Sequence, residues 1–209
     1  MVSIEPGVCQ QQTELLKKML GPLTDMQRQC TLMFDEMDIS HLAAYDHARD
    51  QVFGPHGHLQ VIMLSGLFTT WRLPVLFDFD RPVDQDLLFN TIASVEGAGA
   101  RVAAVVCDQG PTNRGLWKQL GVTQESTCFS NPADSGRRVW VLSDLPHGIK
   151  CLRNNILDNG LTTSRGGRID KELLDKVVQV NGTSDYRLMH KLNANHLQVR
   201  SALLQSPLK

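Results

Sequence analysis

The sequence predicts an α/β fold: a mixed sheet built from a three-stranded meander followed by crossover units, with a helical segment at the C-terminal end. Three observations predict it. Strand-like segments come first in the chain, and strand and helix patterns then alternate. In addition, the run at 101–107 is almost entirely β-branched and small apolar residues, as in a strand buried on both faces.

The first half of the chain predicts a helical region and then the meander. Leucine and methionine recur at helical spacing within 8–29, where Gly21-Pro22 breaks the helix and Thr24-Asp25 would cap a short second one. The meander strands are predicted at 31–39, 59–68 and 71–79. Pro74 lies in the third strand and predicts an edge position or a bulge, because proline cannot donate to a ladder.

Helices and strands alternate from residue 83 onward. An apolar stripe predicts a helix at 83–95, which Gly97-Ala-Gly99 ends. The further elements predicted are strand 101–107, helix 112–120, loop 123–138, strand 139–142, a helix after Asp144, loop 162–168, and helices 171–180 and 191–204. Crossover rules place the first meander strand at the centre, with the 101–107 and 139–142 strands parallel to it on one side.

Composition argues against several classes of protein. The net charge is −1 and the pI about 6.6, so the chain lacks the strongly basic character of many nucleic-acid-binding domains. Five widely spaced cysteines without a CxxC pair indicate reduced thiols in an intracellular protein. The first residues do not resemble a signal peptide, and no apolar run reaches the ~18 residues of a membrane span. We therefore expect a cytosolic or nuclear protein without membrane contact.

The strand at 31–39 carries the first candidate site residue, Asp35. Strand alternation places Asp35 on one face with Met33 and Met37, and Glu36 and Asp38 on the other. A carboxylate within an apolar strand costs several kcal/mol to desolvate unless a metal ion or hydrogen bonds compensate. The alternative is an ordinary core strand in which Asp35 caps a neighbouring loop. Glu36 and Asp38 are expected to make only solvent or loop contacts.

A second carboxylate, Asp108, follows the buried strand at 101–107. Ligands of open α/β sheets bind beyond the carboxyl ends of parallel strands. Asp35 and Asp108 lie 73 residues apart in sequence but are expected to converge at one sheet edge. This is a ribonuclease H-like arrangement, whose chemistry uses paired Mg²⁺ ions about 4 Å apart.

Other polar residues have competing interpretations. Asp144 would support a metal site, contact DNA or cap the following helix, and His147 would assist at the site or pack locally. His56 and His58 suggest zinc, but no further ligand stands at the usual spacing. Two larger groups complete the set. The acidic run Asp78, Asp80, Asp84 and Asp86 is expected to be a solvated face at a helix N-terminus, and Lys150, Arg153, Arg165 and Arg168 would form a phosphate-contacting patch or scattered surface charge.

Three motifs in order resemble the catalytic domain of P element transposases and the related THAP-domain-containing transposase proteins of animals. They are Leu32-Met-Phe-Asp-Glu-Met37, Cys107-Asp-Gln-Gly110 and Ser143-Asp-Leu-Pro-His-Gly-Ile-Lys-Cys-Leu-Arg-Asn-Asn155. The resemblance implies a cut-and-paste DNA transposase with an Asp-Asp-Glu triad and Mg²⁺, in which Asp35 and Asp108 are the first two catalytic, metal-binding carboxylates. It also implies DNA as partner, nuclear localisation and a homo-oligomer.

The same resemblance implies a domain organisation. Residues 1–160 would form the ribonuclease H-like domain and 161–209 the beginning of a helical, GTP-binding insertion, although no phosphate-binding loop motif is present. The family's zinc-binding N-terminal domain and its third acid, a Glu beyond the insertion, are not expected in this sequence. The alternatives are a catalytically inactive regulatory derivative that binds DNA or protein, and an unrelated ribonuclease H-like nuclease.

Overall fold

The computed structural model describes residues 7–8, 10–41, 43–47, 50–183, 189 and 191–198. Contacts divide the chain into two units, Met1–Asp144 and Leu145–Lys209. The predicted boundary at residue 160 stays a prediction. None of the helices in the described part of the chain combines the length and the apolar character needed to cross a membrane.

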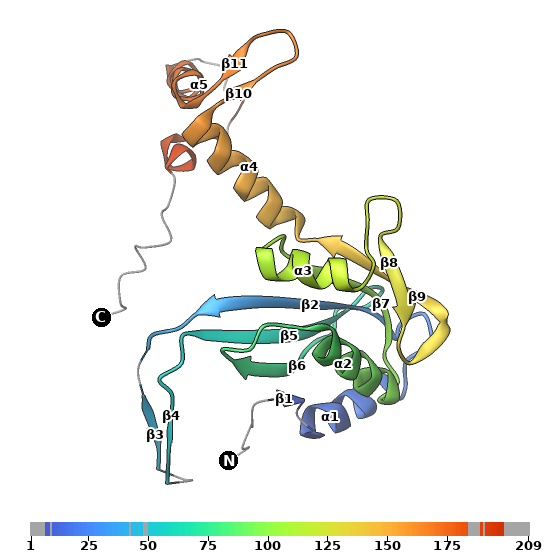
Figure 1. Cartoon of the computed structure of the whole chain (residues 1–209). Helices are drawn as coiled ribbons and strands as arrows, with labels where there is room; N and C mark the ends of the chain where they lie inside the picture. Colours follow the sequence, from blue (N-terminus) through green and yellow to red (C-terminus); the bar gives the residue numbers. More distant parts are fainter. Residues whose placement is uncertain are drawn as a thin grey trace. The chain divides into compact units, whose positions relative to one another are not determined.

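A seven-stranded mixed sheet forms the centre of the first unit, in the order β1-β6-β5-β2-β7-β9-β8 (Figure 1). Its strands are β1 (Gly7–Val8), β2 (Gln29–Asp38), β5 (His58–Gly66), β6 (Arg72–Phe79), β7 (Arg101–Cys107), β8 (Cys128–Asn131) and β9 (Asp134–Ser143). The strand β2 is central: it pairs antiparallel with β5 on one side and parallel with β7 on the other. Because β7 also pairs parallel with β9, the predicted meander and crossover units are confirmed.

Three helices accompany the sheet: α1 (Gln10–Leu20), α2 (Gln85–Gly97) and α3 (Pro111–Gln119). Figure 1 shows α1 and α2 on the same side of it. Asp84 caps α2, since its side chain accepts a hydrogen bond of 2.7 Å from the Leu87 N–H. Pro111 occupies the first turn of α3, where a missing N–H costs nothing.

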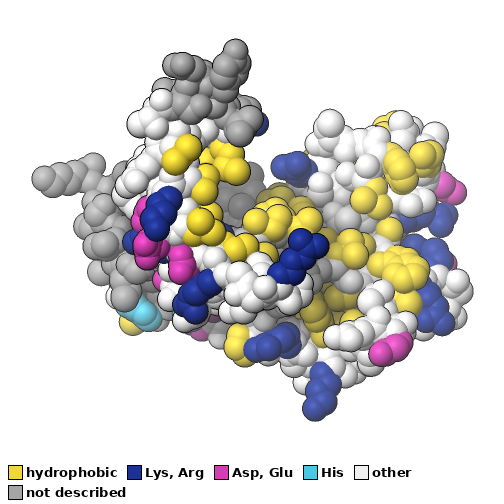
Figure 2. Space-filling model, turned by 90° about the horizontal axis from the view of Figure 1, so that it is seen from above, with side chains coloured by type: hydrophobic (Ala, Val, Ile, Leu, Met, Phe, Trp, Pro, Cys, Tyr) yellow, Lys and Arg dark blue, Asp and Glu magenta, His cyan; other side chains and the backbone are white. Residues whose placement is uncertain are grey.

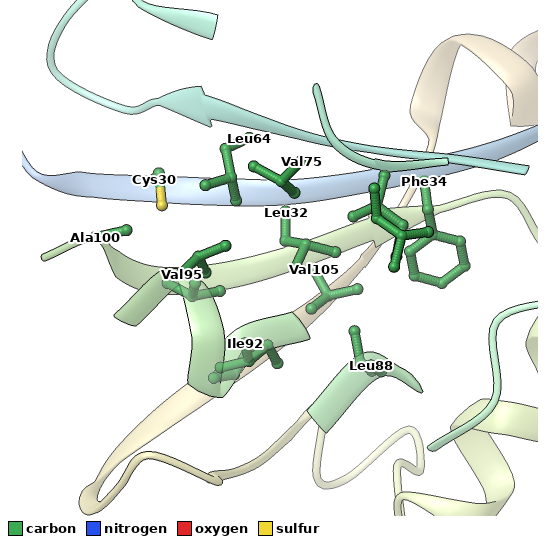
Figure 3. Close-up of a cluster of buried hydrophobic side chains, with 14 of the residues drawn as sticks. Cys30, Leu32, Phe34, Leu64, Val75, Leu88, Ile92, Val95, Ala100 and Val105 are labelled. Atoms are coloured by element: carbon green, nitrogen blue, oxygen red, sulfur yellow. The ribbon is translucent and has the colours of Figure 1, made fainter. Parts of the chain in front are cut away.

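The core lies between the sheet and α2 (Figure 3). Leu32 of β2 pairs with Leu64 of β5 and Val105 of β7, and all three are buried. Leu88 and Ile92 face them from α2 and are fully buried as well. Burying a side chain of this size stabilises the fold by about 1.5–3 kcal/mol. This packing fixes β2, and with it the strand end that carries Asp35.

Two predicted elements are wrong. The short second helix after Thr24 is a single turn, in which the Arg28 N–H donates to the Thr24 carbonyl. The Arg28 side chain bonds the Leu20 and Leu23 carbonyls at the end of α1, which favours this turn over a new helix. The predicted loop 123–138 contains β8 and the start of β9, which form a hairpin. Much of this hairpin is exposed and therefore polar, so it lacks the apolar pattern by which a strand is recognised in a sequence.

Short strands were also missed. The ribbon of β3 (Ala44–Asp46) and β4 (Gln51–Phe53) is inserted between β2 and β5. At Pro74 the predicted bulge is confirmed: the β5–β6 register shifts between Ile62 and Met63, where Pro74 pairs with Met63. Strands of two or three residues give too few alternations to be detected from a sequence pattern.

The second unit contains α4 (Leu145–Asn159), α5 (Lys171–Thr183), the small strands β10 (Leu161–Thr162) and β11 (Arg168–Ile169), and a 3₁₀ helix at Ala194–Leu197. The predicted loop 162–168 is therefore mainly the turn of a short hairpin. The helix predicted at 191–204 is reduced to that 3₁₀ turn within 191–198, and the rest of it lies outside the described residues.

Two buried thiols give the fold a pH dependence. Burial raises the pKa of Cys30 to about 12 and that of Cys107 to about 11. An unfolded thiol loses its proton near pH ~8.5, whereas these two keep theirs. Stability is therefore complete below that pH and is lost progressively as the pH rises toward 11–12. Urea unfolding from pH 7 to pH 10 should show the decline, and a Cys151→Ser variant, which changes an exposed thiol, should leave its slope unaltered. A free energy that stays level above pH 8.5 would contradict this.

Candidate functional site at the carboxyl ends of the central strands

Asp35 and Asp108 lie level with each other on neighbouring strands. In the parallel pair β2–β7, Met33 is the partner of Val106. Asp35 lies two residues after Met33, and Asp108 lies two residues after Val106, so the two aspartates are level with each other. Neighbouring strands lie about 4.8 Å apart, which places the two residues side by side. The predicted convergence of these two residues at one sheet edge is therefore confirmed.

Asp35 is exposed, which corrects the expectation of a carboxylate within an apolar core. The strand β7 ends at Cys107, whereas β2 continues to Asp38 with only β5 as a neighbour. From Asp35 onward β2 thus has one open side, and water reaches its carboxylates. Because the Asp35 carboxylate is hydrated, it pays no desolvation cost. Desolvation is therefore no argument for a metal ion or a hydrogen-bond network at this residue.

A cleft of about 270 Å³ opens at this point of the sheet. It is lined by Phe34, Asp35, Glu36, Asp38, Gln60, Pro82, Asp108, Gly110, Pro111, Thr112 and Asn113. Four of these described residues are carboxylates and none is lysine or arginine. The cleft is therefore strongly acidic, and a phosphate group would be repelled from it unless cations neutralised the wall.

Glu36 and Asp38 correct a second expectation, since strand alternation had separated them from Asp35. All three line the cleft. Alternation assigns side chains to the two faces of a covered sheet, but the end of β2 is open beside β7, so the cleft wraps around the strand there. Glu36 and Asp38 also contact His58 Nδ1, at 3.1 and 3.0 Å.

The local structure orients both central carboxylates. Asp35 Oδ1 accepts a hydrogen bond of 2.9 Å from the Glu36 N–H. Asp108 Oδ1 accepts one of 3.0 Å from the Gly110 N–H and one of 2.6 Å from Asn113 Nδ2. The second set ties Asp108 to the start of α3, so the turn between β7 and α3 determines where its carboxylate lies.

Gln60 is a residue of the cleft that the sequence analysis missed. Its side chain is 4% exposed, and its Nε2 donates to the Asp35 carbonyl at 2.9 Å. A signal was present in the sequence, because alternation along β5 puts Gln60 on the same face as the apolar residues Ile62 and Leu64. A glutamine on the core face of a strand indicates a specific hydrogen-bonding role.

The two histidines next to the cleft have carboxylate partners. His56 Nδ1 lies 2.8 Å from Asp80 Oδ2, and its ring stacks on Phe79. Asp80 Oδ1 accepts from the Gly57 and His58 N–H groups at 2.9 Å. The hydrogen bonds from His56 and these N–H groups hold the pKa of Asp80 below its usual range. Asp80 thus closes a turn, which the interpretation of the acidic run as a solvated face did not foresee.

Asp144 reaches the same sheet edge. Cys107 pairs with Ser143, and the Asp144 N–H donates to the Cys107 carbonyl at 2.8 Å. Asp144 directly precedes α4, the place of an N-cap residue, and its capping of this helix stays a prediction. Its support of a metal site and the part played by His147 in the first turn of α4 stay predictions.

Of the four predicted phosphate-contacting cations, two have local partners. Arg153 donates to Asn154 Oδ1, and Arg168 donates to the Asn159 carbonyl and to Asp170. In Figure 2 the lysine and arginine side chains of the face in view are spread over several places, and some of them lie beside acidic side chains. The cations of the second unit thus show local pairing, and a shared phosphate site stays a prediction.

The cleft suits a hard divalent cation. Mg²⁺ prefers oxygen ligands and keeps several waters, so it is usually held by one or two carboxylates plus substrate phosphates. Asp35 and Asp108 are two such carboxylates, and the buried amide of Gln60 lines the same cleft. No group of three or more histidine, cysteine or acidic side chains in the part of the chain that the structure covers is arranged to hold a metal by itself. The residues therefore fit Mg²⁺ as a partial site that needs further ligands.

Comparison with known proteins gives this arrangement a family. A family model described as TNP-like, RNase H N-terminal domain, matches residues 4–121. The Transposable element P transposase of Drosophila melanogaster is 37% identical over 181 residues, which is 87% of this chain and 24% of that protein. A solved structure, the Drosophila P element transposase strand transfer complex, matches with a TM-score of 0.83 and 35% identity, covering 96% of this chain and 45% of that one.

The chain thus spans about a quarter of the length of the curated relative and less than half of the solved one. The match nevertheless runs through both motifs that carry Asp35 and Asp108, and it agrees with the observed ribonuclease H-like sheet. Metal-dependent chemistry is what such a family implies. The chain therefore belongs to the TNP-like ribonuclease H family, with the P element transposase as a relative.

Proposed function

We propose that this chain supplies the first two catalytic carboxylates, Asp35 and Asp108, of a P element-like DNA transposase. The observation that carries the proposal is their shared position in one acidic cleft, at the ends of adjacent parallel strands. The reaction is Mg²⁺-dependent cleavage of DNA followed by strand transfer. It requires the family's third carboxylate, a Glu, in addition.

The chain's own residues prepare the cleft for this reaction. Hydrogen bonds from Gly110 and Asn113 hold the Asp108 carboxylate, and the Glu36 N–H holds that of Asp35. The acidic wall keeps phosphodiesters out until its charge is neutralised, which couples DNA entry to cation binding. Bound Mg²⁺ would lower the pKa of an attacking water or 3′-hydroxyl and offset charge that develops on the phosphate.

Further parts of the proposal rest on the family resemblance. They are DNA as the partner, a homo-oligomeric assembly, action in the nucleus, and a GTP-binding insertion that begins near residue 161. The support for DNA as partner is that the matched solved structure is a strand transfer complex.

Binding of Mn²⁺, a paramagnetic substitute for Mg²⁺, tests the carboxylate pair directly. We expect Asp35→Asn and Asp108→Asn each to weaken Mn²⁺ binding by about tenfold or more, measured by electron paramagnetic resonance. Asp86→Asn is the matched control, because Asp86 is an exposed carboxylate in the first turn of α2, outside the cleft. Unchanged binding in both cleft variants would contradict the proposal. With Mg²⁺ and DNA, the 209-residue chain alone should not cleave, since two carboxylates hold a metal pair poorly.

A second candidate function is regulation without catalysis, by pairing with a full-length relative or a host protein. The observation that favours it is α5, which buries none of its residues and exposes Leu173 and Val180 to 42% and 66%. Exposed apolar side chains of this kind favour association. Sedimentation equilibrium tests the second candidate, because a strictly monomeric chain at high concentration would count against it.

A further inference from the structure

Gln60 stands where the apolar core of the sheet gives way to the cleft. On β5 it pairs with Glu36 of β2 and with Asp78 of β6, two residues along the strand from Ile62, whose partners are apolar. It lines both the acidic cleft and a neighbouring hollow that also contains His58 and Arg81. It is one of three buried polar residues of the described chain and the only one of them that lines the cleft.

One hydrogen bond fixes the orientation of its amide. Because a backbone carbonyl can only accept, the atom 2.9 Å from the Asp35 oxygen must be Nε2, and Oε1 points elsewhere. Among the residues that the structure covers, no donor reaches Oε1. Buried amide oxygens are nearly always hydrogen-bonded, and an unsatisfied one is costly. The donor for Oε1 is therefore solvent or a group that enters the cleft or the neighbouring hollow, both of which Gln60 lines.

We infer that Gln60 is a positioning residue for a hydrated divalent cation at Asp35. Its Nε2 holds the Asp35 peptide at the point where β2 loses β7 as a neighbour, and its Oε1 accepts a hydrogen bond from a water of that cation. Mg²⁺ keeps several waters, and groups that hydrogen-bond to a metal's ligands set their orientation and strengthen binding. The inference rests on the proposed function, since it needs a cation at Asp35.

The experiment compares Gln60→Met with wild type and with two reference variants, Gln29→Met and Asp35→Asn. Methionine keeps the length of the side chain but neither donates nor accepts strongly. Gln29→Met is the matched control, because Gln29 begins β2 at the opposite end of the sheet. We expect Gln60→Met to weaken Mn²⁺ binding about tenfold and Gln29→Met to leave it unchanged. Thermal unfolding with EDTA shows whether each variant keeps its fold.

A second measurement needs no Gln60 variant. Nuclear magnetic resonance of the wild-type chain should show the Gln60 Cδ signal moving downfield on addition of Mg²⁺, because Oε1 gains a hydrogen bond. The shift should be absent in Asp35→Asn. A residue that only clamps the Asp35 peptide would show no such change.

The outcomes separate this inference from the proposed function. If Asp35→Asn loses Mn²⁺ but Gln60→Met binds as wild type and the Cδ signal does not move, Gln60 is only structural and the inference is wrong. If wild type shows no Asp35-dependent binding at all, the proposed function fails and the inference fails with it. If Gln60→Met does not fold, the Cδ shift decides: movement supports the inference and none overturns it.

Discussion

Replacing Glu96 with alanine is expected to lower the free energy of unfolding by about 3–5 kcal/mol, because it breaks a partly buried charge pair and leaves two further donors without an acceptor. Glu96 lies at the end of α2 with its side chain 9% exposed. Its Oε1 accepts from the Val102 N–H at 2.9 Å and from Asn131 Nδ2 at 2.8 Å, and its Oε2 pairs with Arg137. One carboxylate thus joins a helix to β7, β8 and β9.

Urea unfolding followed by tryptophan fluorescence measures this change, since all three tryptophans belong to the first unit. The control is Asp134→Ala, which removes the other carboxylate on Arg137. Because Asp134 is half exposed, its loss should cost far less. Equal effects of the two substitutions would show that the buried network contributes no special stability.

Shortening Leu32 to alanine should cost about 2–5 kcal/mol, the usual range for emptying a filled core site. Leu32 is fully buried on the central strand, between Leu64 and Val105. The neighbouring strands cannot close over the cavity without losing their register. The same urea experiment measures the loss.

Met37→Ala provides the comparison on the same strand. Met37 is 55% exposed, so its truncation should change stability by no more than about 0.5 kcal/mol. If Met37→Ala lowered the free energy of unfolding as much as Leu32→Ala does, the open end of β2 would have to pack against another part of the molecule. The contrast therefore tests where along β2 the core stops, which is also where the cleft begins.

Much of the sheet could be predicted because its central strands carry strong patterns. The strand at 101–107 was predicted with its observed bounds, since seven nearly continuous apolar residues between a glycine pair and Asp108 leave little choice. The end of β2, in contrast, was misjudged. Alternation describes a strand with neighbours on both sides. The sequence does not say that β7 ends at Cys107, one residue before the position level with Asp35.

Gln60 also shows what strand alternation cannot predict. Alternation along the strand predicts that Gln60 lies on the core face. It does not predict the hydrogen bond from Gln60 to the Asp35 carbonyl, because backbone groups leave no signature in the sequence. The hairpin of β8 and β9 was missed because exposed strands need not alternate. Contacts to backbone groups and to solvent are decided by geometry.

By itself, the sequence determined the order of the longer strands and helices of the first unit, the central place of β2, and the convergence of Asp35 and Asp108, because buried apolar runs and crossover rules leave few alternatives. Only the tertiary structure decided that Asp35 is exposed, that Glu36 and Asp38 share its cleft, and that Gln60 stands behind it. The physical reason is that side-chain periodicity encodes which face of an element is buried. The site lies where the sheet ends and that periodicity no longer governs the surroundings.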